Sequence, residues 1–166
     1  MKNLLFIIVL LTNIGTKAQT NNFYLSDSKI SWQKVYETSK SKTELMTYFS
    51  NAGIFEKKFK VVADTIFAQL KSHKTDPDKT GTAGVPEPVN KTDFKGLVTI
   101  YFKDKEYKVV LQKILLIGRG DFLKKKEEKP IEEYFVRRTK SEYTPGFLKK
   151  PIRIYDITFN EIFELK

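Results

Sequence analysis

One stretch of the chain carries carboxylates at a spacing that could hold a metal ion. In residues 76–87, acidic side chains stand at positions 1 and 3 (Asp76 and Asp78), Gly81 stands at position 6 and Glu87 at position 12. An oxygen-bearing side chain stands at position 5. This is the ligand order of a calcium loop, which a bidentate glutamate closes. We call residues 76–87 the calcium-loop-like segment.

The surroundings of this segment argue against a calcium site. Pro86 and Pro88 interrupt the helix that should follow, and the apolar residue expected at position 8 is only Ala83. No second loop of this type is present to pair with it. Turn-rich loops produce such strings by chance, so we predict no metal-ligating residues here.

The remaining chemistry of the chain is limited by its composition. It has no Cys, which excludes a disulfide, a thiol nucleophile and an iron–sulfur cluster. His73 is the single histidine, so one chain cannot form a two-histidine metal site, and its surroundings are typical of an exposed, incidental residue. The sequence has no Gly-rich phosphate loop and no recognisable carboxylate motif. We therefore predict no catalytic, cofactor-binding or metal residues, and no cofactor.

Alternating side chains and a capping signal predict the first elements. Residues 30–37 indicate a strand, with Ile30, Trp32 and Tyr36 on one side. Ser41 and Glu44 form a capping box that should begin a helix over 42–51. Residues 59–70 are β-type, but their apolar parity shifts after residue 63, which indicates either a bulge or two short strands.

The clearest tertiary prediction is an antiparallel hairpin of residues 96–102 and 107–111 around a turn at 103–106. The second strand should continue to residue 117, before Gly118 and Gly120. The alternation predicts that one face of this hairpin joins the core: Val98, Ile100, Phe102, Tyr107, Val109 and Leu111.

The other segments are less regular. Residues 21–28 are predicted to be a loose leader, and the turn-rich residues 73–93 a disordered loop. Pro130 is predicted to begin a helix over 131–138. Residues 152–158 indicate a last strand, whereas 159–165 fit either its continuation or a turn of helix.

The first residues are typical of an export signal. Lys2 precedes an apolar run from Leu4 to Leu11, and small residues at Thr16 and Ala18 suit signal-peptidase cleavage after residue 18. The run is shorter than the roughly 20 apolar residues that span a bilayer. We expect a signal peptide at 1–18, a single domain at 19–166, and an exported protein, periplasmic or secreted, with no lipid anchor.

Positive charge is the other signal. The chain has 30 Lys+Arg and 20 Asp+Glu, a net charge of +10. Residues 119–153, which we call the basic segment, hold 11 basic and six acidic side chains with aromatic residues between them. Export makes nucleic acid an unlikely partner, so anionic lipid or envelope polysaccharide are better candidates. An ordinary solvated surface is the other interpretation.

The order of elements from residue 30 to 111, and the hairpin phrase over 102–109, resemble a family of small exported Gram-negative bacterial proteins of unknown function. These proteins have a fold like that of the TATA-binding protein (TBP). The resemblance covers residues 29–117. It implies an α+β fold: a single antiparallel sheet of four to six strands with two short helices on one face. No catalytic or binding residue is known for that family, and a shared fold does not imply DNA binding.

The functional expectation is an exported, non-enzymatic domain that binds a macromolecular partner, either a protein or an anionic envelope component. Nucleic acid binding and integral membrane insertion after signal cleavage are not expected. The alternative is a small carboxylate-dependent hydrolase of the cell envelope, which would need a concave pocket with acidic side chains of raised pKa. A purely structural role in a larger assembly is a third possibility.

Overall fold

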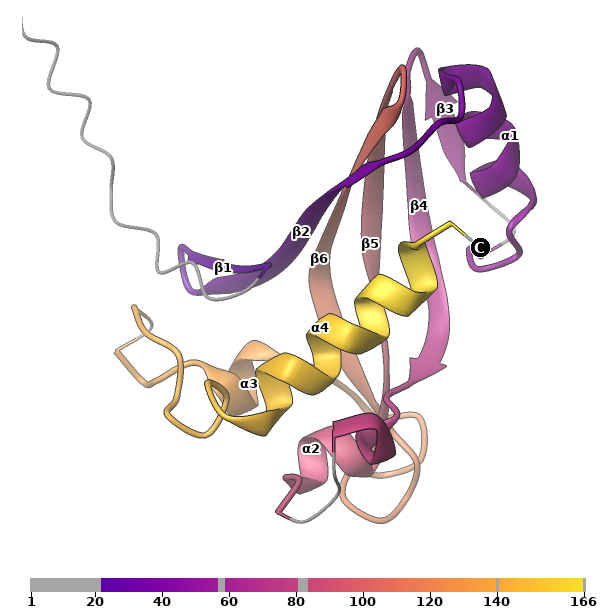
Figure 1. The fold of residues 1–166 in the computed structure, drawn as a ribbon. Helices are drawn as coiled ribbons and strands as arrows, with labels where there is room; N and C mark the ends of the chain where they lie inside the picture. The colour runs from indigo at the N-terminus through magenta and orange to yellow at the C-terminus, as the bar shows by residue number, and fades with distance from the viewer. Residues whose placement is uncertain (1–21, 57–58, 81–83, 140, 166) are drawn as a thin grey trace, which may run out of the picture.

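A computed structural model describes residues 22–56, 59–80, 84–139 and 141–165. The predicted signal peptide, 1–18, lies outside these residues. The chain forms one antiparallel sheet in the order β1-β2-β6-β5-β4-β3, and β7 pairs with β6 beyond the end of β2 (Figure 1). The strands are β1 (Phe23–Ser26), β2 (Lys29–Glu37), β3 (Lys60–Val62), β4 (Thr65–Lys74), β5 (Thr92–Lys103), β6 (Glu106–Gly118) and β7 (Glu128–Pro130). The helices are α1 (Lys42–Asn51), α2 (Glu87–Asn90), α3 (Glu132–Phe135) and α4 (Lys150–Phe163), with a 3₁₀ turn at Pro77–Thr80.

The fold class predicted from the sequence is confirmed. The structure is α+β, with a six-strand path plus the three-residue β7, all pairs being antiparallel. The β5–β6 hairpin has the predicted register, with Phe102 opposite Tyr107 and Val98 opposite Leu111. Its two-residue turn places Lys105 at a φ of 62°. All six predicted core residues of the hairpin are buried.

The two longer helices cover the same face of the sheet. Helix α4 lies diagonally across it, and α1 lies beside β3, at the end of the sheet away from α2 (Figure 1). The Phe49 ring of α1 is 5.2 Å from the ring of Tyr107, and the Phe163 ring of α4 is 5.9 Å from that of Trp32. The Tyr107 hydroxyl donates a 2.9 Å hydrogen bond to the backbone carbonyl of Phe163. One continuous aromatic core therefore lies between the sheet and both helices.

Polar side chains align α4 with β2 along the edge of this core. The Asp156 carboxylate accepts hydrogen bonds from the Trp32 indole N–H at 2.7 Å and from the Asn22 side chain at 2.8 Å. One turn later, the Asn160 side-chain oxygen accepts from Lys34 Nζ at 2.7 Å and from the Tyr36 hydroxyl at 3.1 Å. Residues i and i+4 of a helix lie on one face, and alternate residues of a strand do the same. The two elements are therefore joined in register.

The predicted capping box is present at the start of α1. The Ser41 hydroxyl accepts from the Glu44 backbone N–H, and the Glu44 carboxylate accepts from the Ser41 backbone N–H at 2.8 Å. The Ser41 hydroxyl also donates to the Glu44 carboxylate at 2.7 Å, and this bond, together with the one from the Ser41 backbone N–H, lowers the pKa of Glu44. Gly53, just beyond the helix, has the left-handed φ of 68° that favours glycine. The parity shift after residue 63 resolves into two strands, β3 and β4, joined by a tight turn in which Ala63 has a φ of 47°.

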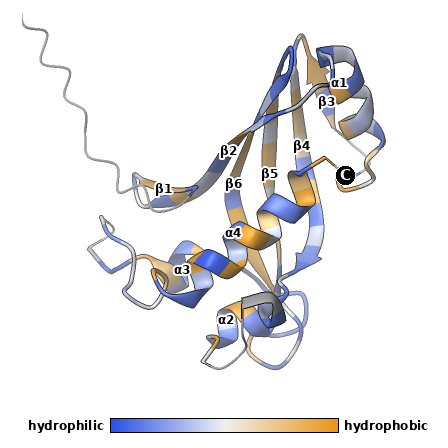
Figure 2. Ribbon diagram, viewed as in Figure 1, coloured by the Kyte–Doolittle hydropathy of each residue, from blue (hydrophilic) through white to orange (hydrophobic). Residues whose placement is uncertain are grey.

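The predicted strand over 152–158 is wrong, because these residues belong to α4. The segment is rich in isoleucine and alternates locally, which is typical of a strand. Its buried positions, however, continue into residues 159–163 at spacings of three and four, which is a helical period. Figure 2 shows that hydrophobic and hydrophilic residues both occur along this helix. Pro151 falls in the first helical turn, where a missing N–H costs little. Residues 159–163 are helical as well, so the choice left open for them is settled.

Three further segments differ from their predictions. Residues 23–26 form β1 rather than a loose leader, because Phe23 is fully buried against Phe147 and Phe159. The helix expected over 131–138 is limited to α3, since Val136 is extended and bridges to Tyr143. The described residues of the expected disordered loop, 73–80 and 84–93, contain the end of β4, the 3₁₀ turn, α2 and the start of β5.

Candidate functional site

The residues of the calcium-loop-like segment make contacts within the fold. The Glu87 carboxylate, its expected closing ligand, pairs with Lys91 Nζ at 2.7 Å. Asp76 accepts a hydrogen bond from the backbone N–H of Asp78 at 3.2 Å. Among the residues that the structure describes, no three His, Asp or Glu side chains come close enough to hold a metal ion.

His73 lies on β4 instead of in a loop. Its ring is stacked on Phe94, with the centroids 6.1 Å apart. Its Nδ1 is 2.8 Å from the backbone carbonyl of Lys71, which can only accept, so Nδ1 must carry a proton. These contacts orient the ring against the sheet.

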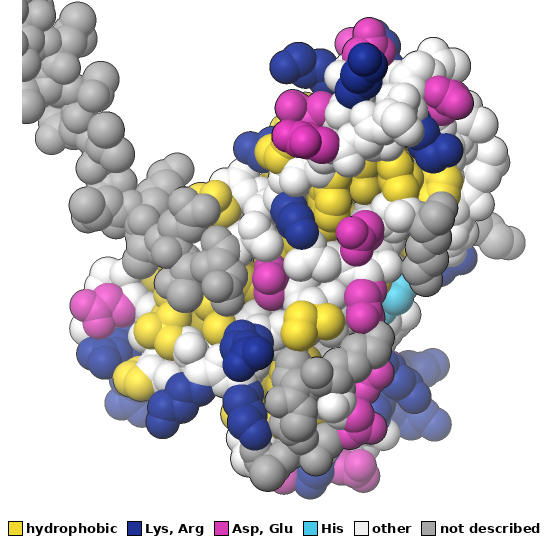
Figure 3. Space-filling view, in the orientation of Figure 1, with side chains coloured by type: hydrophobic (Ala, Val, Ile, Leu, Met, Phe, Trp, Pro, Cys, Tyr) yellow, Lys and Arg dark blue, Asp and Glu magenta, His cyan; other side chains and the backbone are white. Residues whose placement is uncertain are grey.

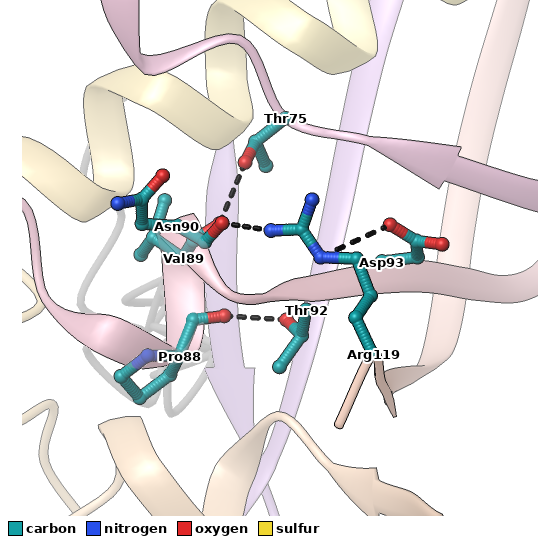
Figure 4. A network of polar contacts seen from close by, with 7 residues as sticks. All are labelled: Thr75, Pro88, Val89, Asn90, Thr92, Asp93 and Arg119. Carbon is teal, nitrogen blue, oxygen red and sulfur yellow. Dashed lines mark hydrogen bonds and ion pairs between the residues drawn. The ribbon is translucent and has the colours of Figure 1, made fainter. Parts of the chain in front are cut away.

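A polar network at one end of the sheet attaches α2 to the strands beside it (Figure 4). The Thr75 hydroxyl donates to the Val89 carbonyl at 2.7 Å. The Arg119 guanidinium contacts the Asn90 carbonyl oxygen and lies 3.7 Å from the Asp93 carboxylate. Val89 itself is fully buried. The network therefore joins α2 to the end of β4, to the start of β5 and to Arg119 just after β6.

The basic segment does not form a surface of one sign. Arg119 pairs with Asp93, Arg137 pairs with Glu142, and Lys129 lies within 4 Å of two glutamates of the same segment. On the face seen in Figure 3, Lys and Arg side chains gather at the lower left with few Asp or Glu among them, and the two signs are mixed elsewhere. These pairs engage some of its basic side chains, but with 11 basic against six acidic residues the segment keeps a positive excess.

Carboxylates gather at one hollow of about 510 Å³ between the β1–β2 turn and α3. Asp27, Glu132 and Glu133 line it, together with basic side chains. The Glu132 carboxylate accepts a 3.0 Å hydrogen bond from the Ile30 backbone N–H, so it anchors α3 to β2. A glycosidase-type pair needs two carboxyl groups that are free to meet a substrate, and the Glu132 carboxylate is already engaged by this hydrogen bond.

The pKa values raised most belong to core tyrosines. Burial raises the pKa of Tyr36, Tyr107, Tyr143 and Tyr155 well above the ordinary value of a phenol. Tyr155 is 1% exposed. These hydroxyls lie among aromatic side chains of the core, and they stay protonated at neutral pH.

The face of the sheet turned away from α1 and α4 differs from the rest of the surface. We call it the open face. Large apolar side chains on it are exposed to solvent: Val35 (50%), Tyr101 (48%), Phe67 (45%), Val62 (45%) and Leu97 (43%). Isolated exposed apolar residues are ordinary, but a contiguous group on one face indicates an interaction surface.

The strand register shows that this group is contiguous. In antiparallel sheets, directly paired residues share a face and lie about 4.5–5.5 Å apart. The pairing places the open-face side chains in three neighbouring rows. The first row is Val35, Lys108, Tyr101, Thr65 and Val62; the second is Gln33, Val110, Thr99, Phe67 and Lys60; the third is Gln112, Leu97 and Gln69.

A shallow hollow of about 490 Å³ lies within these rows. Phe67 and Leu97 line it, with Phe59 and Lys60 at one side and Gln112 at the other. Its residues come from β4, β5, β6 and the β3 edge, so the sheet itself holds them in place. The three rows contain aromatic, aliphatic, amide, hydroxyl and ammonium groups, and no carboxylate.

The open face was not predicted from the sequence. The alternation of residues predicts the inward side chains of the hairpin, and it gives no role to Leu97 and Tyr101, which alternate with them. The available signal was a strand, residues 97–102, that is apolar on both sides although only one side is covered.

An antiparallel sheet with helices on one face and the other face open gives this chain an α+β fold of the TBP-like kind. The predicted resemblance in fold is confirmed by two solved structures. One is a TBP-like protein from Parabacteroides distasonis, at 14% identity and a TM-score of 0.50, covering 84% of this chain and 94% of that one. The other is a DUF4468 family protein from Bacteroides ovatus, at 17% identity and a TM-score of 0.51, covering 86% of each chain.

At such identities the likeness shows the fold alone. No family model and no curated protein matches the sequence. None of the helices in the described residues is long and apolar enough to cross a membrane.

Proposed function

We propose that this chain is an exported, non-enzymatic binding domain that receives a macromolecular partner on the open face. The observation that carries the proposal is the exposed apolar group on three adjacent rows of one rigid sheet. The opposite face of that sheet packs against the helices, with Trp32 and Tyr107 of the sheet buried there together with Phe159 of α4. Leaving this second apolar face uncovered favours aggregation, and a partner that covers it removes that cost.

The size of the open face supports a macromolecular partner. Five strands at about 4.8 Å spacing and three rows about 6.8 Å apart cover roughly 24 by 20 Å. This is about half of the roughly 800 Å² that each side of a standard protein interface buries. The hollow is too shallow to enclose most of a small molecule, as ligand pockets do. A moderate, reversible association is therefore the expected mode.

The positions of the carboxylates favour binding over hydrolysis. Glu132 holds the Ile30 backbone, Asp156 holds the Trp32 indole, and Glu44 caps α1. The open-face rows have no carboxylate that could act as a general acid or base. The hydrolase alternative therefore gains no support from the described residues.

Site-specific photocrosslinking in the native cells tests the binding proposal. A photoreactive amino acid at Leu97 should give a discrete adduct, whereas the same amino acid at the exposed Arg153 on α4 serves as the matched control. The adduct should disappear when Phe67→Ser is added. Equal adducts at both positions, or none at Leu97, would refute a partner on the open face.

Export is tested separately. The protein recovered from the envelope or the medium should begin at Gln19, as measured by mass spectrometry of the intact chain. Recovery of the uncleaved chain from the cytoplasm would contradict export, and it would leave the open-face proposal standing.

A further inference from the structure

The open face carries two lysines whose charge is not offset. Lys60 lies at the end of the second row, and Lys108 lies in the first row between Val35 and Tyr101. No carboxylate of a described residue forms an ion pair with either lysine. Both ammonium groups therefore stand among apolar side chains without a counter-charge.

The lysines that flank the rows have a different environment. Lys95, beyond one end of the three rows, pairs with Glu128 of β7. Lys103, beyond the other end, is directly opposite Glu106 in the register. Carboxylates thus accompany lysines at both borders of the face and are absent between them. The three rows therefore hold two ammonium groups and no carboxylate, whereas the next row beyond Lys108 holds Glu37, Glu106 and Lys103.

Building on the proposed function, we infer that the partner is a protein segment that presents carboxylates around one large apolar side chain. The apolar side chain enters the hollow between Phe67 and Leu97, where it is desolvated on several sides. The carboxylates meet Lys60 at the rim of that hollow and Lys108 in the adjacent row. A buried apolar anchor surrounded by weaker polar contacts is the usual arrangement of an interface hot spot.

The composition of the rows favours a protein segment over an anionic polysaccharide. The five most exposed apolar side chains of the open face are three aliphatic ones (Val35, Val62 and Leu97) and two aromatic ones (Tyr101 and Phe67). Aliphatic groups have no polar contact to offer sugar hydroxyls, whereas they pack well against apolar side chains of a protein. The two lysines supply charge complementarity, which sets specificity and association rate more than raw affinity.

The experiment is a selection of displayed random peptides on the mature chain, with counter-selection on the Leu97→Ser variant. Peptides of about 12 residues suffice, because an extended chain covers about 3.3 Å per residue. Selected peptides should share one aromatic or large aliphatic residue flanked by Asp or Glu. Their affinities for the chain are then measured by fluorescence anisotropy.

Charge reversal is the decisive comparison. Lys60→Glu with Lys108→Glu should weaken binding at least about tenfold, equivalent to about 1.4 kcal/mol. Lys149→Glu with Arg153→Glu, the same charge change on the opposite side of the sheet, should leave binding within about twofold. Binding of the unaltered chain should also weaken between about 0.05 M and about 0.5 M salt. All four side chains lie on the surface, so circular dichroism should show intact folds.

Three outcomes would overturn this inference. Selected peptides that lack acidic residues, equal effects of the two charge reversals, or binding of an acidic polysaccharide in place of any peptide would each do so. In all three cases, a specific adduct at Leu97 in the photocrosslinking experiment would still support the open face as the binding surface. Failure of the partner chemistry is therefore distinguishable from failure of the proposed function.

Discussion

The hydrogen bond between Asp156 and the Trp32 indole should contribute measurably to stability. Trp32 is fully buried, and its N–H has the Asp156 carboxylate as acceptor at 2.7 Å. Asp156→Ala leaves that donor without an acceptor. A buried unsatisfied donor costs about 1–3 kcal/mol, and a bond to a charged acceptor lies at the upper end of this range. We therefore expect a loss of about 2–3 kcal/mol, or roughly 5–10 °C in Tm for a domain of this size.

The assay is urea unfolding followed by fluorescence, because Trp32 is the only tryptophan of the chain and reports on its own environment. Asp156→Asn is the matched control. It keeps an acceptor oxygen in the same place and loses only the charge, so it should cost about 1 kcal/mol. If Asp156→Ala changes stability by less than about 0.5 kcal/mol, or if Asp156→Asn is equally harmful, the argument from the buried donor is refuted.

Four other predictions concern two core tyrosines, the pH dependence of stability, the close packing around Gly118 and the calcium-loop-like segment. Tyr155→Phe removes a buried hydroxyl that has no hydrogen-bond partner, so it should be neutral or stabilising, whereas Tyr107→Phe loses the bond to the α4 backbone and should cost about 1 kcal/mol. In the unfolded chain tyrosine ionises near pH 10, whereas burial raises the pKa of the folded tyrosines above that value. The free energy of unfolding should therefore be constant below about pH 10 and fall above it. The fall should be less steep in Tyr155→Phe. Urea unfolding from about pH 8 to about pH 11 measures both effects, and a gain in stability with rising pH would contradict them. Gly118→Ala should destabilise the fold by about 1–3 kcal/mol or more, because the new Cβ would lie 2.7 Å from the Leu123 side chain. Gly146→Ala is the control, since the nearest atom to its Cβ is 3.9 Å away. Equal Tm values for the two variants would refute this prediction. Millimolar Ca²⁺ should shift the Tm by less than about 1 °C, and a larger concentration-dependent rise would show binding.

Local signals in the sequence were sufficient where a single element decides its own structure. The capping box at Ser41 and Glu44 predicts the start of α1, because both partners lie within one turn. The alternation from Val98 to Phe102 predicts the inward face of β5 in the same way. In these segments the local pattern and the tertiary fold agree, so the local pattern is sufficient to predict the element and its buried side.

The incorrect predictions share one feature: the deciding residue lies outside the segment that was interpreted, either far away in the chain or just beyond the segment's end. Phe23 belongs to a strand because Phe159, distant in sequence, packs on it. The helix α4 is specified by an apolar stripe that includes Phe163, beyond the end of the expected strand. The open face was missed for a related reason. An exposed Leu97 looks like a core residue until the structure shows which side of the sheet the helices cover.

The charge distribution shows why a count of basic residues is a poor guide to a binding site. The basic segment holds half of the formal excess charge, yet several of its ammonium and guanidinium groups are paired with neighbouring carboxylates. An exposed paired charge contributes little to stability or to long-range attraction, because water and its partner screen it. Lys60 and Lys108 are only two charges, but they lie among apolar side chains without a carboxylate partner. Covering those apolar side chains lowers the local dielectric, which strengthens any ion pair that the partner makes there. The open face therefore combines two weak attractions that reinforce each other only when a partner supplies both.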